Sequence, residues 1–229
     1  MHVPDGFLNL PTSVATGVAA ATVIGFALKG AGRELDDRSA PMGGLVATFV
    51  FAGQMMNFPI GAGTSGHLIG GALAATLVGP WMGILCVSVV VIVQALFMAD
   101  GGITALGTNV LLMAVLTVLV AAGVNKLLLS LLPKRVGLVA PVSGVAAFLS
   151  VLCAAAAFTA LFIVGGNTPI APALLFKAMM GWHVLIGLGE AVITALIVGG
   201  VLALRPDLVW AARPLLGSRP LEVRTGPVR

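Results

Sequence analysis

Long apolar runs separated by short polar segments dominate the hydrophobic pattern of the chain. They lie at about residues 11–30, 41–57, 67–79, 81–98, 103–123, 138–164 and 174–204. Runs that approach 20 apolar residues are long enough for a helix to cross the hydrocarbon core of a bilayer. The pattern therefore predicts an all-α membrane protein with about seven transmembrane helices.

The stretch 67–98 could be one long helix or two helices. Proline directly after glycine, as in Gly79-Pro80, is a strong helix breaker. Apart from Lys177, the basic residues form three groups: Lys29, Arg33 and Arg38; Lys126, Lys134 and Arg135; and Arg205, Arg213, Arg219, Arg224 and Arg229. A break at Pro80 puts all three groups on one side of the membrane, as the positive-inside rule requires. We therefore predict seven spans, with the N-terminus outside and the C-terminus in the cytoplasm.

The composition supports a membrane protein. Only 9% of the 229 residues are charged, 59% are hydrophobic, and the mean hydropathy is +1.12. Soluble domains carry about 25% charged residues. We expect one transmembrane domain over residues 1–204 and a short basic cytoplasmic tail over residues 205–229. The net charge of +4 orients the helices in the membrane and does not indicate a nucleic-acid partner.

Four irregular segments share the outer side in this topology: residues 1–10, 57–67, 100–102 and 165–173. They are rich in Pro, Gly, Asn and Thr, which favour turns over helices. Irregular backbone near membrane depth is tolerated where it is packed in protein or lines a polar cavity. We therefore predict an outward-facing cup.

Two of the three histidines, His2 and His67, fall in these outer segments, and the third is His183. The α-amine of Met1, the deprotonated amide of His2 and the His2 imidazole can close two fused chelate rings in one plane. His67 could fill the fourth position, and planar nitrogen ligands suit Ni(II) or Cu(II). The large second residue should protect Met1 from removal, and Pro4-Asp5-Gly6 could turn the terminus into the cup. Taken singly, His2 could be incidental at an exposed terminus and His67 an ordinary polar residue at a helix start.

Other polar residues in apolar surroundings are candidates for the second shell of such a site. His183 and Glu190 lie seven residues apart on one helix face, and an intramembrane acid is a functional candidate. The alternative is a buried hydrogen-bonded pair that fixes helix packing. Asn57, Ser65 and Asn109 complete the set, because polar groups in such surroundings need partners.

Gly17, Ala21 and Gly25 form a stripe of small residues on the first predicted helix. Such stripes allow close helix approach, either to a partner subunit or within the bundle. The sequence contains no phosphate-binding loop, no GxSxG and no HExxH motif. We therefore expect no enzyme activity, and active transport would need a partner that hydrolyses ATP.

Four motifs carry a resemblance to a known family: MHVPDGFLN at the start, NFPIGAGTSGHLIGG at 57–71, ADGGITALGTN at 99–109 and HVLIGLGEAVITAL at 183–196. They are similar to the CbiM/NikM family, the substrate-binding (S) components of energy-coupling-factor ABC transporters for nickel or cobalt. The resemblance implies an S-component bundle with an extra N-terminal helix and the N-terminus inserted in a metal pocket. It assigns four nitrogen ligands to Met1, His2 and His67, with Ni²⁺ or Co²⁺ as substrate and no organic cofactor.

The resemblance also implies partners in a prokaryotic cell membrane. They are a transmembrane coupling (T) subunit and two ATP-binding subunits. A small auxiliary membrane protein, if one is required, would be a separate chain, because residues 205–229 contain no further span. The alternative function is a stand-alone divalent metal permease, and an intramembrane enzyme is the weakest reading. The planar nitrogen set favours nickel over cobalt without excluding cobalt.

Overall fold

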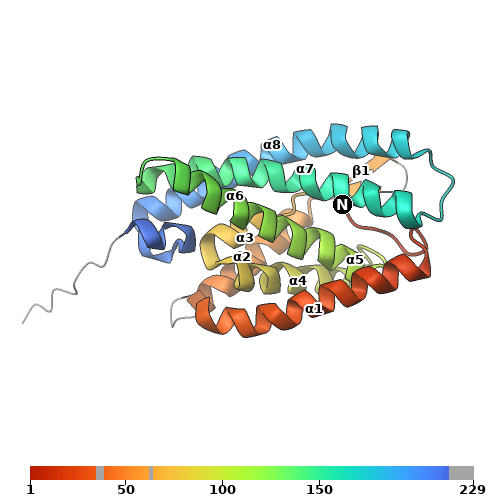
Figure 1. Cartoon of the computed structure of the whole chain (residues 1–229), viewed down its shortest axis with the longest axis horizontal. Helices are drawn as coiled ribbons and strands as arrows, with labels where there is room; N and C mark the ends of the chain where they lie inside the picture. The colour runs from red at the N-terminus through yellow and green to blue at the C-terminus, as the bar shows by residue number, and fades with distance from the viewer. Residues whose placement is uncertain (35–38, 62–63, 217–229) are drawn as a thin grey trace, which may run out of the picture.

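The computed structural model describes residues 1–34, 39–61 and 64–216, which form a helical bundle with one small β-hairpin (Figure 1). The elements in chain order are α1 (Leu10–Glu34), α2 (Ser39–Gln54), β1 (Phe58–Gly61), β2 (Thr64–Gly66), α3 (Gly71–Val78), α4 (Pro80–Phe97), α5 (Leu106–Asn109), the π-helix η1 (Val110–Leu116), α6 (Thr117–Leu131), the 3-10 helix η2 (Val136–Leu138), α7 (Val139–Gly165), α8 (Pro172–Leu204), and the 3-10 helices η3 (Pro206–Leu208) and η4 (Trp210–Leu215). The strands β1 and β2 pair antiparallel.

Five helical stretches of the described chain are long and apolar enough to cross a membrane: Leu10–Glu34, Pro80–Phe97, Leu106–Leu131, Val136–Gly165 and Pro172–Leu204. They confirm a helical, multi-pass architecture. Helix α3 has only eight residues, or about 12 Å of length, against a hydrocarbon core of about 30 Å. The expected span 67–79 is thus an irregular stretch followed by a short buried helix. Seven full crossings, and the side of each terminus, stay predictions.

The predicted break between the third and fourth runs is confirmed. Helices α3 and α4 meet at Gly79, whose φ of 92° lies in the left-handed region that favours glycine. Pro80 then opens α4, where its missing N–H costs no helical hydrogen bond. The carboxyl group of Glu34, at the end of α1, accepts hydrogen bonds from the backbone N–H groups of Trp81 (3.3 Å) and Met82 (2.8 Å). This contact joins the end of α1 to the start of α4.

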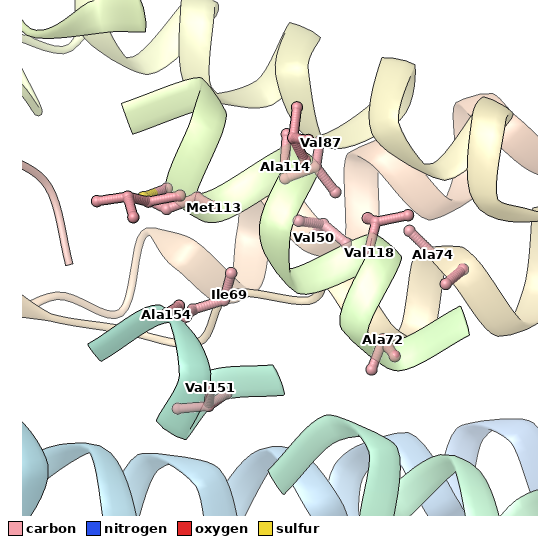
Figure 2. Packing of buried hydrophobic residues seen from close by; sticks show 14 of the residues in the cluster. Val50, Ile69, Ala72, Ala74, Val87, Met113, Ala114, Val118, Val151 and Ala154 are labelled. Atoms are coloured by element: carbon pink, nitrogen blue, oxygen red, sulfur yellow. The ribbon is translucent and has the colours of Figure 1, made fainter. Parts of the chain in front are cut away.

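Helix α3 lies at the centre of the bundle. All eight of its residues are buried, which explains why its sequence is apolar on every side. Figure 2 shows part of the surrounding core, with Val50, Ile69, Ala72, Ala74, Val87, Met113, Ala114, Val118, Val151 and Ala154 labelled. These residues come from α2, the segment before α3, α3, α4, η1, α6 and α7, so most of the bundle shares one core.

The N-terminal segment threads into the bundle before α1 begins at one end (Figure 1). Leu8 pairs with Gly166 as an isolated antiparallel bridge. The N–H of Asn9 donates to the carbonyl of Gly165 at 2.7 Å, and the N–H of Asn167 donates to the carbonyl of Phe7 at 3.0 Å. The predicted outer segments 1–10 and 165–173 therefore meet at one end of the molecule.

Beyond α8, the short helices η3 and η4 turn back onto the bundle. Val209 and Ala212 have no exposed surface, so residues next to the expected domain boundary at 204 contribute to the core. Residues 217–229 of the predicted basic tail lie outside the described residues. The division into a domain and a tail stays a prediction.

Gly107 provides a test of the close contact between α5 and α1. A Cβ at Gly107 would lie 2.3 Å from the Cα of Gly17, a backbone atom that cannot move aside. We expect Gly107→Ala to lower the free energy of unfolding by about 1–3 kcal/mol, as overpacking does. The control Gly123→Ala adds a methyl group in open space on α6, and it should be neutral or stabilise the helix by up to about 1 kcal/mol. Thermal unfolding in detergent measures both, and equal midpoints for the two variants would contradict the contact.

Candidate metal centre

The chain terminus is the centre of a buried nitrogen-rich site. Met1 and His67 are both 0% exposed and His2 is 3% exposed. The α-amine of Met1 lies 2.5 Å from Nε2 of His67. The ring centroids of His2 and His67 are 4.7 Å apart. The structure thus brings together the three residues that the sequence singles out as candidate ligands.

The His67 ring is oriented by its own segment of chain. Its Nδ1 lies 2.7 Å from the carbonyl oxygen of Leu68, which can only accept a hydrogen bond. Nδ1 therefore carries the proton, and Nε2 presents a lone pair to the Met1 amine. A histidine that donates one ring N–H to a carbonyl and offers the other nitrogen is arranged as metal-binding histidines are.

His2 is enclosed by the loop that follows α4. Its Nδ1 lies 3.2 Å from Oδ1 of Asp100, and Oδ2 of Asp100 accepts a hydrogen bond from Nδ2 of Asn57 at 3.1 Å. Gly101, with a φ of 94°, passes so close that a Cβ there would lie 2.9 Å from Cδ2 of His2. The buried side chain of Gln94 is near enough to influence the His2 imidazole. Nδ1, the nitrogen that a terminal chelate would use, faces Asp100 in this structure.

Hydrogen bonds to the backbone of Val3 hold the N-terminal segment in place inside the bundle. Oδ1 of Asn109 accepts from the N–H of Val3 at 2.7 Å, and Nδ2 of Asn109 donates to the carbonyl of Val3 at 3.1 Å. The N–H of Gly102 donates to the same carbonyl at 2.9 Å. Further out, Oδ1 of Asp5 accepts from both the N–H and the hydroxyl of Thr104. Asn109 therefore positions the segment that carries the candidate ligands by bonding to the backbone of that segment.

The electrostatics of the terminus favour neutral nitrogen donors. Burial lowers the pKa of the Met1 α-amine from its ordinary 8.0 to about 4, although Asp100 and Glu190 oppose the shift. Burial also lowers the pKa of His2, against the raising effect of Asp100. The hydrogen bond from His2 in turn lowers the pKa of Asp100. At neutral pH the amine lone pair is available without loss of a proton.

His183 and Glu190 are buried, as expected, but each uses a different partner. Nδ1 of His183 donates to the carbonyl of Met179 at 2.7 Å, and its Nε2 has no hydrogen-bond partner within the described ranges. Oε1 of Glu190 accepts from the N–H groups of Ile69 and, at 3.2 Å, Gly70. Glu190 therefore contacts the segment that carries His67, and the open alternative of a His183–Glu190 hydrogen bond does not describe this structure.

The structure says less about the remaining candidates, Ser65 and the small residues of α1. Ser65 lies in β2 opposite Pro59, and its side chain falls outside the described residues. Ala21 and Gly25 are exposed on α1, and a Cβ at Gly17 or Gly25 would meet nothing within 4 Å. The backbone of Gly17 contacts Gly107, so the stripe serves internal packing at one point. A partner helix on its open face stays a prediction.

Sequence reasoning missed Gln54, Gln94 and Asp100. Both glutamines are 0% exposed, and both are single polar residues within apolar runs. The same feature, a polar residue within an apolar run, identified Asn109 as a candidate, and it applied equally to both glutamines. Asp100 stood in a quoted motif, but nothing in the sequence indicated its contact with His2.

Side chains alone do not make a metal site here. No group of three or more His, Cys, Asp and Glu side chains suited to a metal ion occurs within residues 1–34, 39–61 and 64–216. A site at this position therefore depends on the donors of the chain terminus itself, the α-amine of Met1 and the backbone nitrogen of His2.

Comparison with known proteins finds similar proteins that are named as metal transport proteins. A protein of Haloquadratum walsbyi, provisionally named as a metal transport protein, is 36% identical over 210 residues, which are 92% of this chain and 94% of that protein. The fused nickel transport protein NikMN of Rhodobacter capsulatus is 42% identical over 127 residues, 56% of this chain and 37% of that protein. The crystal structure of a truncated transition metal transporter matches with a TM-score of 0.82 and 32% identity, covering 89% of this chain and 99% of that chain.

Membrane-length helices packed around a buried chain terminus define a multi-pass membrane protein. The CbiM family, described as the cobalt uptake substrate-specific transmembrane region, matches residues 2–208. The chain belongs to this family, which confirms the resemblance to the CbiM/NikM components. It is a transmembrane component for the uptake of cobalt or nickel, and its relatives are transport components.

The lowered pKa of the terminus predicts a pH-dependent stability of the metal-free protein. Between about pH 8 and pH 4 the unfolded chain binds a proton at the Met1 amine that the folded chain does not bind. The free energy of unfolding should therefore fall as the pH falls through this window. A difference of one proton corresponds to about 1.4 kcal/mol per pH unit. Thermal unfolding in detergent at pH 8, 7, 6 and 5 measures the trend.

An N-terminally acetylated protein is the control, because it has no titrating amine. Its midpoint should depend less on pH over the same range, with the remaining dependence below about pH 6.5 coming in part from His2, whose pKa is also lowered. Parallel curves for the native and acetylated proteins would show that the amine stays protonated in the fold.

Proposed function

We propose that this chain is the substrate-binding component of an energy-coupling-factor transporter and takes up Ni²⁺. The ion would bind to the Met1 amine, the deprotonated amide and imidazole of His2, and Nε2 of His67. The observation that carries the proposal is the buried contact of 2.5 Å between the Met1 amine and His67. Burial of an α-amine against an imidazole lone pair has little value for folding alone, since it removes a normally charged group from water.

The distances are compatible with a shared ion. Metal–nitrogen bonds of about 2.0 Å place neighbouring donors of a planar site about 2.8 Å apart. The amine and Nε2 of His67 need to separate by only about 0.3 Å from their contact of 2.5 Å. Ring closure through Nδ1 of His2 requires the imidazole to leave Asp100, 3.2 Å away. Asp100 is then a neighbouring negative charge that favours a bound cation.

The choice of nickel over cobalt rests on ligand chemistry. Four nitrogen donors in one plane, one of them a deprotonated amide, suit a square-planar d⁸ ion. A similar protein carries a nickel transport name, whereas the family is described by cobalt uptake. Cobalt is therefore the alternative substrate of the same site.

The energy for uptake would come from partner subunits. The chain has no phosphate-binding loop, so we assign ATP hydrolysis to two ATP-binding subunits that act through a transmembrane coupling subunit. A small auxiliary membrane protein would be a separate chain. By the positive-inside rule, the basic groups favour a metal site on the outer side and a C-terminus in the cytoplasm, and we assign the protein to a prokaryotic cell membrane.

Blocking the terminus tests the chelate. Acetylation of Met1 converts the amine to an amide while both imidazoles remain. We expect Ni²⁺ affinity to fall by orders of magnitude, as in His67→Ala, because a ligand and a chelate ring are lost. Calorimetry and the absorption of planar, diamagnetic Ni²⁺ measure the change in purified protein.

His183→Ala is the comparison variant, since His183 is buried near the site but is not a proposed ligand. Its loss should be smaller, about 10–100-fold. A blocked protein that binds nickel as tightly as the native one would exclude the terminal chelate and leave His2 to act through its side chain.

Uptake assays separate this function from a stand-alone permease. Expressed alone in cells, the chain should bind metal but accumulate little radioactive Ni²⁺. Co-expression with coupling and ATP-binding subunits should produce ATP-dependent accumulation, and ATP-binding subunits inactivated in their phosphate-binding loop are the control. Strong uphill uptake by the chain alone would favour the permease.

A further inference from the structure

The peptide of Ile69 is held from both sides by buried side chains of two different helices. Oε1 of Glu190, on α8, accepts from the N–H groups of Ile69 and Gly70. Nε2 of Gln54, at the end of α2, donates to the carbonyl of Ile69 at 2.7 Å. Gln54 is 0% and Glu190 3% exposed. We call this arrangement the Gln54–Glu190 clamp.

The segment 67–70 needs such partners, because it has no regular secondary structure and lies inside a membrane protein. Backbone N–H and C=O groups away from water must be paired, and this segment precedes the first turn of α3. Hydrogen bonds to a carboxyl group are among the stronger ones when it is ionised. The clamp therefore ties the segment to α2 and to α8 at one peptide.

The clamp is two residues from the candidate ligand His67. An extended chain covers at most about 3.6 Å per residue, so the Cα of His67 lies within about 7 Å of that of Ile69. The ring of His67 bonds to Leu68 in its own segment, which orients the ring without attaching it to a helix. The side chain of Ile69 is fully buried in the core (Figure 2). The place of Nε2 relative to the Met1 amine thus depends on how Ile69 is held.

An open pocket lies beside the clamp, between α2 and α8. It is lined by Val50 and Gly53 of α2, by Leu68, and by Glu190 and Thr194 of α8. Helices α2 and α8 are therefore not packed closely against each other beside the clamp. A change in their separation would act on the Ile69 peptide.

We infer that Gln54 and Glu190 are positioning residues, which hold His67 at the distance from the Met1 amine where both bind one ion. The inference rests on the proposed function.

Glu34 provides a matched control within the chain. Its carboxyl group also accepts two backbone N–H groups, those of Trp81 and Met82 in the first turn of α4. It lies at the far end of α1, about 36 Å along the helix axis from Leu10. Loss of Glu34 should affect stability without affecting the metal site.

The experiment compares Gln54→Met, Glu190→Met and Glu34→Met, which keep side-chain length but remove the hydrogen bonds, together with Glu190→Gln, which keeps one acceptor. Ni²⁺ titration and absorption spectra are recorded on purified full-length proteins in detergent. We expect affinity to fall about 10–100-fold in Gln54→Met and Glu190→Met, with absorption shifted to longer wavelength by a weaker ligand field. Glu190→Gln should lose less, and Glu34→Met should bind like wild type with a lower unfolding midpoint.

A second measurement needs no metal. Amine-reactive labelling of the metal-free proteins, read by mass spectrometry of the N-terminal peptide, reports how well His67 covers the Met1 amine. Labelling should be faster in Gln54→Met and Glu190→Met than in wild type and Glu34→Met.

Two results would overturn the positioning role: wild-type affinity, spectrum and labelling in the two clamp variants, or equal losses in Glu34→Met, which would indicate general destabilisation. The wild-type titration reports separately on the proposed function. If the native protein does not bind Ni²⁺, that function fails, while the labelling rates still decide whether the clamp holds His67.

Discussion

The burial of an uncharged chain terminus is the constraint on which the rest of this structure depends. An ionised amine inside a helical bundle would be very unfavourable, so Met1 can be buried only as a neutral base with a partner. His67 supplies that partner, Asn109 fixes the depth of the terminal segment through Val3, and pairing with residues 165–167 holds the segment at the end of the bundle. The same arrangement that allows burial places two nitrogen donors, the Met1 amine and Nε2 of His67, next to each other.

Much of the fold could be predicted because the membrane-length helices are continuous apolar runs and Gly79-Pro80 is a local signal. The stretch 67–79 was less predictable, since apolar composition does not distinguish a span from a short helix surrounded by others. Residues 67–70 are irregular, and Gln54 and Glu190, which come from distant parts of the chain, pair with their backbone. Such long-range contacts leave no periodic pattern in the sequence.

The candidate ligands were predictable because their chemistry is rare in this chain, with three histidines and one terminus. Their surroundings were not. Helical spacing placed His183 and Glu190 on one face, but His183 bonds to Met179 in its own helix and Glu190 bonds to the segment before α3. Asp100 contacts His2 only because the loop after α4 folds over the terminal segment. Polarity within an apolar run marks a buried group, as for Gln94, without indicating its partner.

The contacts of the terminus also determine when the site can form during synthesis. Met1 binds a residue 66 positions later in the chain, and Val3 binds one 106 positions later. The first residue to leave the ribosome must therefore wait until α5 has been made before its surroundings exist. Contacts that close such long loops carry an entropic cost that is recovered only once both ends are ordered. We therefore expect the terminal segment to dock only after the residues that it contacts, up to Gly165 and Asn167, have been made.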